Sequence, residues 1–70
     1  MDSAKLAMMA DQIARNFAAQ GENAAVNQTA EHIRLYWESR MIDAVLISER
    51  AHLSPIAAAA IDLLAGERQT

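Results

Sequence analysis

A chain of 70 residues without cysteine has room for one domain, which buries only roughly 60–65% of the surface that the unfolded chain exposes. The missing cysteines exclude disulfides and thiolate metal sites. Its net charge is −3, with six bases scattered among nine acids, which argues against nucleic acid as a partner because phosphate binding needs clustered Lys and Arg. No apolar run approaches the roughly 20 residues of a membrane span, and the acidic start is unlike a signal peptide. We therefore predict a cytoplasmic protein without membrane contact.

Apolar residues first recur at helical spacing between residues 3 and 20. The residues three or four positions apart are Leu6, Met9, Ile13 and Phe17. This spacing predicts a helix over about 3–20. Asp2 or Ser3 can cap its start, and Gly21 can supply the left-handed residue that commonly ends a helix.

Three further helices follow by the same criteria. The second, over about 23–37, carries Val26, Ala30, Ile33 and Trp37 at helical spacing. The third is expected over about 39–50 with Ser39 as its cap. The fourth is expected over 54–65, with Ser54 as cap, Pro55 at the first helical position and Gly66 at the end. The sequence thus predicts an all-α fold, a small bundle of three to four short helices forming one domain over residues 1–70.

Some large apolar residues lie off the main apolar faces of these helices. At 100° per residue, Leu35 lies opposite the Ile33 face, while Met8 and Ile47 are displaced from the apolar faces of their own helices. Because alanine accounts for 16 of the 37 apolar residues, a four-helix monomer cannot bury every larger side chain. Such surface usually marks a protein interface.

Residues that could carry chemistry are sparse. His32 and His52 are twenty positions apart without the neighbours of a zinc motif, and the hydroxyl residues lack a nucleophile context. Two glycines cannot form a phosphate loop, and acid pairs such as Glu31 with Glu38 are best interpreted as solvated charge. We predict no catalytic, cofactor-binding or metal-binding residue in this chain.

The densest stretch is EHIRLYWESRM, residues 31–41. Tyr, Trp and Arg are the residues most enriched in interface hot spots, and Arg34 and Arg40 could bind a partner's carboxylates in bidentate fashion. The same pattern is also explained if Trp37 anchors the core and the arginines are solvated. A docked subunit allows both interpretations.

This stretch also carries a family resemblance. TAEHIRLYWESRM resembles the AxHLRxFWxPxMR signature of the delta subunit of soluble, NAD-dependent formate dehydrogenases that contain molybdenum or tungsten, and KLAMMADQIARNF is similar to that family's opening KLxxMANQIAxFF helix. The resemblance covers about residues 5–42, and the Leu53-Ser54-Pro55 helix start is compatible with it. The matching residues are Lys5, Leu6, Met9, Ala10, Gln12, Ile13, Phe17, Ala30, His32, Ile33, Arg34, Tyr36, Trp37, Arg40 and Met41.

The chain departs from the family pattern at three places. Asp11 stands where the family usually has Asn, Glu38-Ser39 replaces a typical Asp-Pro, and Ile42 stands where a second basic residue is common. Ser39 can still start a helix, so the turn is expected to survive. Ile42 supplies no positive charge for an acidic group of a partner.

The resemblance implies a non-catalytic small subunit. Its partners would be the large catalytic alpha subunit and, through it, the beta and gamma subunits. Those subunits would hold the bis-molybdopterin guanine dinucleotide (bis-MGD) molybdenum or tungsten centre, the iron–sulfur clusters, FMN and the NAD site, while this chain would bind no cofactor. In the family this subunit is linked to complex stability or to maturation of the molybdenum-containing subunit, and both roles stay open.

Residues and resemblance together predict a partner interface. Its residues are His32, Arg34, Leu35, Tyr36, Trp37, Arg40, Met41, Met8 and Ile47. Two alternatives remain open, a free-standing helical regulator such as a small helix-turn-helix DNA binder, and a homo-oligomeric bundle without large partners.

Overall fold

The fold is built from short helices, as predicted. The computed structural model describes residues 2–68, apart from the side chain of His52. The helices are α1 (Ser3–Phe17), α2 (Glu22–Tyr36), α3 (Ser39–Leu46) and α4 (Pro55–Arg68), with 3-10 turns at Ala18–Gln20 and Arg50–His52. Strands are absent from this part of the chain, which confirms the all-α prediction.

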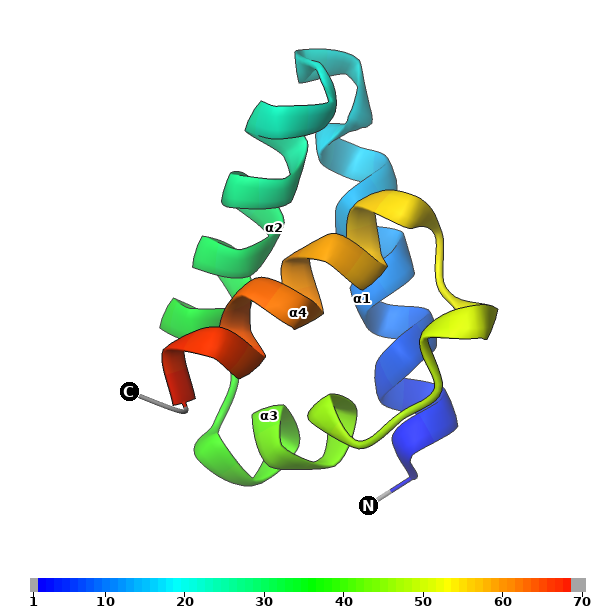
Figure 1. Ribbon diagram of the computed structural model, residues 1–70, viewed down its shortest axis with the longest axis vertical. Coiled ribbons are helices and arrows are strands. Elements are labelled where there is room, and N and C mark those ends of the chain that lie inside the picture. Colours follow the sequence, from blue (N-terminus) through cyan, green and yellow to red (C-terminus); the bar gives the residue numbers. More distant parts are fainter. Residues whose placement is uncertain (1, 69–70) are drawn as a thin grey trace.

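Helices α1 and α2 form an antiparallel hairpin that the remaining elements cover. In Figure 1, α4 crosses in front of this hairpin and α3 lies across its lower end. The radius of gyration is 10.7 Å, close to the roughly 11 Å expected for a compact chain of this length.

The hairpin turns at Gly21. Asp2 caps the start of α1, since its Oδ1 accepts a hydrogen bond from the Ala4 N–H at 3.0 Å. The helix ends at Phe17, and a 3-10 turn follows it. Gly21 follows with φ +99° and ψ 153°, a conformation that is strained for any residue with a Cβ. Its φ is positive as predicted, but Gly21 lies outside the left-handed helical region because its ψ is extended.

The third helix is shorter than the predicted 39–50 and ends at Leu46. The Ser48 hydroxyl donates to the Val45 carbonyl at 2.7 Å, so a side chain replaces the next helical hydrogen bond. Arg50 then donates to the carbonyls of Leu46 and Ser48 at 3.0 and 2.6 Å. These contacts satisfy the carbonyls at the helix end, and a further turn is not needed.

Other predicted boundaries also differ. Ser39 is the first helical residue and not the cap, since extended Glu38 precedes it without a side-chain capping bond. Gly66 lies inside α4, which continues to Arg68. Its last turn is held by ion pairs of Glu67 and Arg68 with side chains of α2 and α3. The predicted cap Ser54 does accept a hydrogen bond from the Ala57 N–H, at 3.3 Å.

The core lies where all four helices meet. Its buried residues are Leu6, Ala10, Ala30, Ile33, Trp37, Ile42, Val45, Ala60, Ile61 and Leu64. Fully buried alanines on α1, α2 and α4 leave little side-chain volume between these helices. The core therefore depends on few large side chains, and Trp37 contributes the largest.

Candidate interaction surfaces

Several large apolar side chains are exposed to solvent. Met8 is 72% exposed, Leu35 64%, Tyr36 73% and Ile47 82%, while Met9 and Leu63 are exposed to a smaller degree. Helical periodicity had placed Met8, Leu35 and Ile47 off the core faces, and the structure confirms their exposure. Tyr36, another predicted interface residue, is exposed as well and is the last residue of α2.

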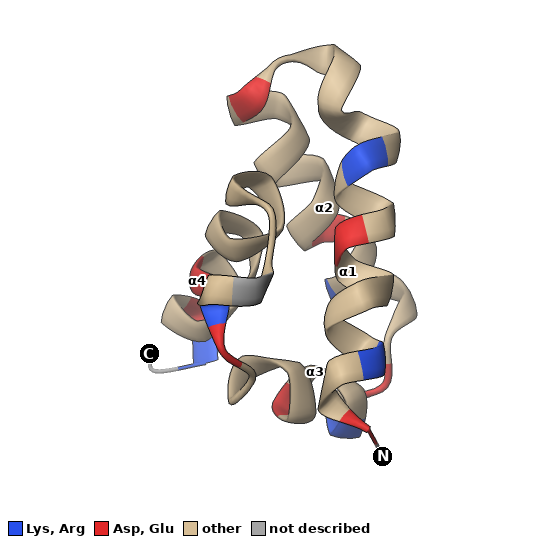
Figure 2. Ribbon diagram, turned by 90° about the vertical axis from the view of Figure 1, so that its right-hand side faces the viewer, with Lys and Arg blue, Asp and Glu red and all other residues tan. Residues whose placement is uncertain are grey.

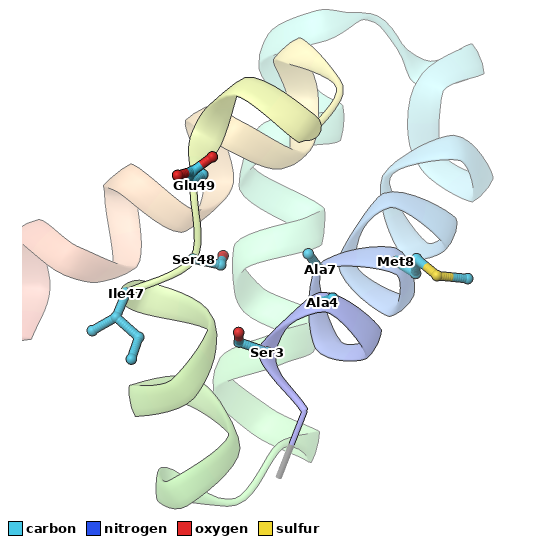
Figure 3. Close-up of a pocket in the computed structure, with 7 residues that line it drawn as sticks. All are labelled: Ser3, Ala4, Ala7, Met8, Ile47, Ser48 and Glu49. Atoms are coloured by element: carbon cyan, nitrogen blue, oxygen red, sulfur yellow. The ribbon is translucent and has the colours of Figure 1, made fainter.

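Met8 and Ile47 lie on two margins of one groove between α1 and the end of α3, which we call the α1–α3 groove. Its lining residues are Ser3, Ala4, Ala7, Met8, Ile47, Ser48 and Glu49, and its volume is about 430 Å³. Figure 3 shows the short side chains of Ser3, Ala7 and Ser48 between the two helical segments, with Met8 and Ile47 on the outer sides. The fold thus brings two predicted interface residues from distant parts of the chain to one surface.

Three other predicted residues line a smaller hollow on α2 and the end of α1, which we call the α1–α2 depression. It has a volume of about 230 Å³ and is lined by Phe17, Gln28, Glu31, His32, Leu35 and Tyr36. The rings of His32 and Tyr36 lie 4.9 Å apart between centroids and are tilted by 46°. This surface mixes aromatic, apolar and acidic groups.

Arg34 and Trp37 serve the fold itself. Arg34 forms a bidentate pair with Glu67 of α4, with Nε 2.9 Å from Oε1. This hydrogen-bonded pair lowers the pKa of Glu67 and raises the pKa of Arg34. Trp37 is only 8% exposed and belongs to the core. Trp37 is therefore covered within the chain, whereas Arg34 is bound to Glu67 but keeps 43% of its side chain exposed.

Two further ion pairs join α4 to its neighbours. Arg50 Nε lies 2.9 Å from Asp62 Oδ1, and Arg68 Nη1 lies 2.7 Å from Asp43 Oδ1. The arginines of the C-terminal half are therefore engaged within the chain, apart from Arg40, which is exposed. Met41 is half-buried and packs against the core.

The small residues that line the α1–α3 groove were not predicted from the sequence. Ala4, Ala7 and Met8 share one side of α1 at spacings of three and four positions, and this small-residue stripe beside Met8 was the signal. The contribution of Ser48 depends on where α3 ends, which the periodicity placed too far along the chain. The groove could not be predicted without that boundary.

The described part of the chain offers neither a cluster of metal ligands nor a membrane-spanning helix. No three or more His, Cys, Asp or Glu side chains in residues 2–68 gather to hold a metal ion, and the side chain of His52 lies outside the described structure. None of the helices described is long and apolar enough to cross a bilayer.

Comparison with known proteins gives one result that covers most of the chain. No curated protein and no solved structure matches it. The family described as NADH-dependent formate dehydrogenase delta subunit matches residues 5–61. The match extends beyond the motifs near residues 5–42 and includes the first half of α4. The chain therefore belongs to the family of NADH-dependent formate dehydrogenase delta subunits.

Proposed function

We propose that the chain is a non-catalytic accessory subunit that docks by helical faces on the large catalytic alpha subunit. A subunit of formate dehydrogenase belongs to a complex with other subunits. The observation that carries the proposal is the exposure of Met8, Leu35, Tyr36 and Ile47. Four large side chains of this kind on so small a surface favour docking on a partner over an independent existence.

Burial of these side chains supplies a physical reason for docking. Covering one large apolar side chain fully is worth about 1.5–3 kcal/mol, and a domain of this size has little stability of its own. Contact with an apolar surface of the partner would therefore favour binding and would also stabilise the folded delta subunit.

The proposal leaves the redox chemistry to the partners. As the family resemblance implies, the bis-MGD metal centre, iron–sulfur clusters, FMN and NAD site would lie in the alpha, beta and gamma subunits of a cytoplasmic enzyme. The delta subunit would support either the stability of the complex or the maturation of the metal site in the alpha subunit.

Purification of the native enzyme tests the docking. Active formate dehydrogenase isolated from the source cells should contain a 7.6 kDa chain, detectable by mass spectrometry of the intact complex. Active complex without this chain would contradict the proposal.

Deletion of the subunit separates the two supporting roles. Reduced molybdenum per alpha subunit in the deletion strain would indicate maturation. Normal metal content with poor recovery of the complex would indicate stability. Unchanged metal content, recovery and activity would show that the chain supports neither.

A further inference from the structure

The last turn of α4, residues 65–68, lies beyond the buried part of that helix. Leu64 is the final buried residue of α4. After it, Ala65 is half-buried, and Gly66, Glu67 and Arg68 are exposed. Glycine is one of the least favourable residues inside a helix. Apolar packing and helix propensity therefore contribute little to holding this turn in place.

Two ion pairs tie this turn to two different helices. Glu67 binds Arg34 of α2, with Arg34 Nε 2.9 Å from Glu67 Oε1. Arg68 Nη1 lies 2.7 Å from Oδ1 of Asp43 on α3. Figure 1 shows the turn beside the lower end of α2 and above α3, and Figure 2 shows acidic and basic segments close together at this end of α4. The four side chains are between 40% and 63% exposed, so dissolved salt can screen both pairs.

A hollow joins this turn to the core, and we call it the α2–α4 hollow. Its volume is about 380 Å³, and its lining residues are Arg34, Trp37, Ser39, Ile42, Leu64, Glu67 and Arg68. Trp37 and Ile42 are the most exposed members of the core, although only at 8% and 7%. Three of the four residues in the ion pairs therefore border the same hollow as these two core side chains.

We propose that the last turn of α4 is a strap that the two ion pairs hold closed, and that it opens locally and uncovers Trp37 and Ile42 when these pairs are weakened. Exposed ion pairs contribute little free energy, whereas burial of Leu64 fixes the preceding turn of α4. Opening can therefore stop at Leu64 and leave the rest of the bundle folded. This behaviour belongs to the chain itself and does not depend on docking to a partner.

The third ion pair of α4 provides a contrast. Asp62 Oδ1 lies 2.9 Å from Arg50 Nε, and Asp62 stands between the buried residues Ile61 and Leu64. Core packing holds α4 at this position whether or not the pair forms. Asp62→Asn is therefore a matched control, because it removes an ion pair from α4 without reaching the strap.

Amide hydrogen exchange of the full-length chain, followed by NMR, measures the opening. Raising the salt concentration from about 0.01 M to about 1 M shortens the screening length from about 30 Å to about 3 Å. The protection factors of the Glu67 and Arg68 amides should then fall about threefold relative to that of Ile33, which is fully buried in the core.

Substitutions at low salt test the same opening without changing the solvent. Glu67→Gln combined with Asp43→Asn removes both pairs and should lower the protection of the Arg68 amide about threefold relative to Ile33. Gly66→Ala should raise it about fourfold, because alanine favours the helical state of the strap. Asp62→Asn should leave it unchanged.

The fluorescence of Trp37, the only tryptophan of the chain, reports whether opening uncovers the core. Its quenching by acrylamide should rise about twofold in high salt and in the double variant. In Asp62→Asn it should stay at the wild-type level. Circular dichroism of each variant verifies that the other helices are intact.

Faster exchange at the strap together with stronger quenching of Trp37 supports the inference. Faster exchange without stronger quenching would show that the turn frays without uncovering the core, and this result overturns it. Unchanged exchange and quenching, or equal changes in Asp62→Asn, overturn it as well. An equal loss of protection at Ile33 would identify global unfolding in place of a strap.

Discussion

Asp11 provides a direct test of how α1 and α4 are held together. Its Oδ1 accepts a hydrogen bond from the Ser54 N–H at 2.9 Å, across 43 positions of sequence. Ser54 immediately precedes α4, so the carboxylate also lies at the positive end of that helix. Replacement by alanine leaves a partly buried N–H without its acceptor.

The expected magnitude follows from three contributions. A hydrogen bond to a charged acceptor contributes about 1.5 kcal/mol at a partly exposed site, and the helix dipole adds about 0.5 kcal/mol. Alanine regains about 0.6 kcal/mol of helix propensity within α1. Asp11→Ala should therefore lower the free energy of unfolding by about 1.4 kcal/mol. Asp11→Asn keeps an acceptor and should lower it by about 0.7 kcal/mol.

Urea unfolding followed by circular dichroism and by the fluorescence of buried Trp37 measures these differences. Asn16→Ala is the matched control, because Asn16 is exposed on the same helix and should show the propensity gain alone, about 0.5 kcal/mol of stabilisation. If Asp11→Ala stabilises the protein as Asn16→Ala does, the hydrogen bond does not support the fold. Equal losses for the alanine and asparagine variants would refute the role assigned to the retained acceptor.

Three further substitutions probe separate features of the fold, and equilibrium unfolding measures each. Gly21→Ala should lower the free energy of unfolding by about 1–2 kcal/mol, because Gly21 has a φ of +99°. Gly66→Ala should raise it by about 0.5–1 kcal/mol, because Gly66 lies inside α4 and a Cβ there meets nothing within 4 Å. Changes of the same sign in the two variants would contradict this. Thr29→Val should stabilise by about 1 kcal/mol, because the buried Thr29 hydroxyl has no hydrogen-bond partner; a loss would indicate a partner for the hydroxyl. Hydrogen bonding from Arg34 lowers the pKa of Glu67 in the folded protein. The stability difference between wild type and Glu67→Gln should therefore be fully present above the unfolded pKa of about 4.5 and disappear as the pH falls through the lower folded pKa. A difference that persists in acid would rule out the ionised pair as its source.

Helical periodicity was sufficient for the fold class and for three of the exposed apolar residues. Whether Met8, Leu35 and Ile47 lie on or off a core face depends only on their angle around the helix axis, which sequence spacing gives directly. That Met8 and Ile47 line opposite sides of one groove depends on how α1 packs against α3. Sequence spacing contains no information on that packing.

The helix ends were predicted less well because side-chain contacts decide them. The end of α3 depends on the hydroxyl of Ser48 and on Arg50, which bind the final carbonyls. The continuation of α4 through Gly66 depends on ion pairs formed by Glu67 and Arg68 with residues 33 and 25 positions away. The position of Gly66 in the sequence gives no sign of these ion-pair partners, which lie far away along the chain.

The motif EHIRLYWESRM divides between the inside and the outside of the molecule. Ile33 and Trp37 form part of the core, and the guanidinium of Arg34 is occupied by Glu67. A loss of docking in Arg34→Ala would therefore have two sources, a missing partner contact and a loosened α2–α4 contact. Glu67→Gln weakens the same internal contact while leaving Arg34 in place, so the two variants separate these sources. Docking that weakens in Arg34→Ala but persists in Glu67→Gln would assign the guanidinium to the partner. Equal losses would assign it to the fold.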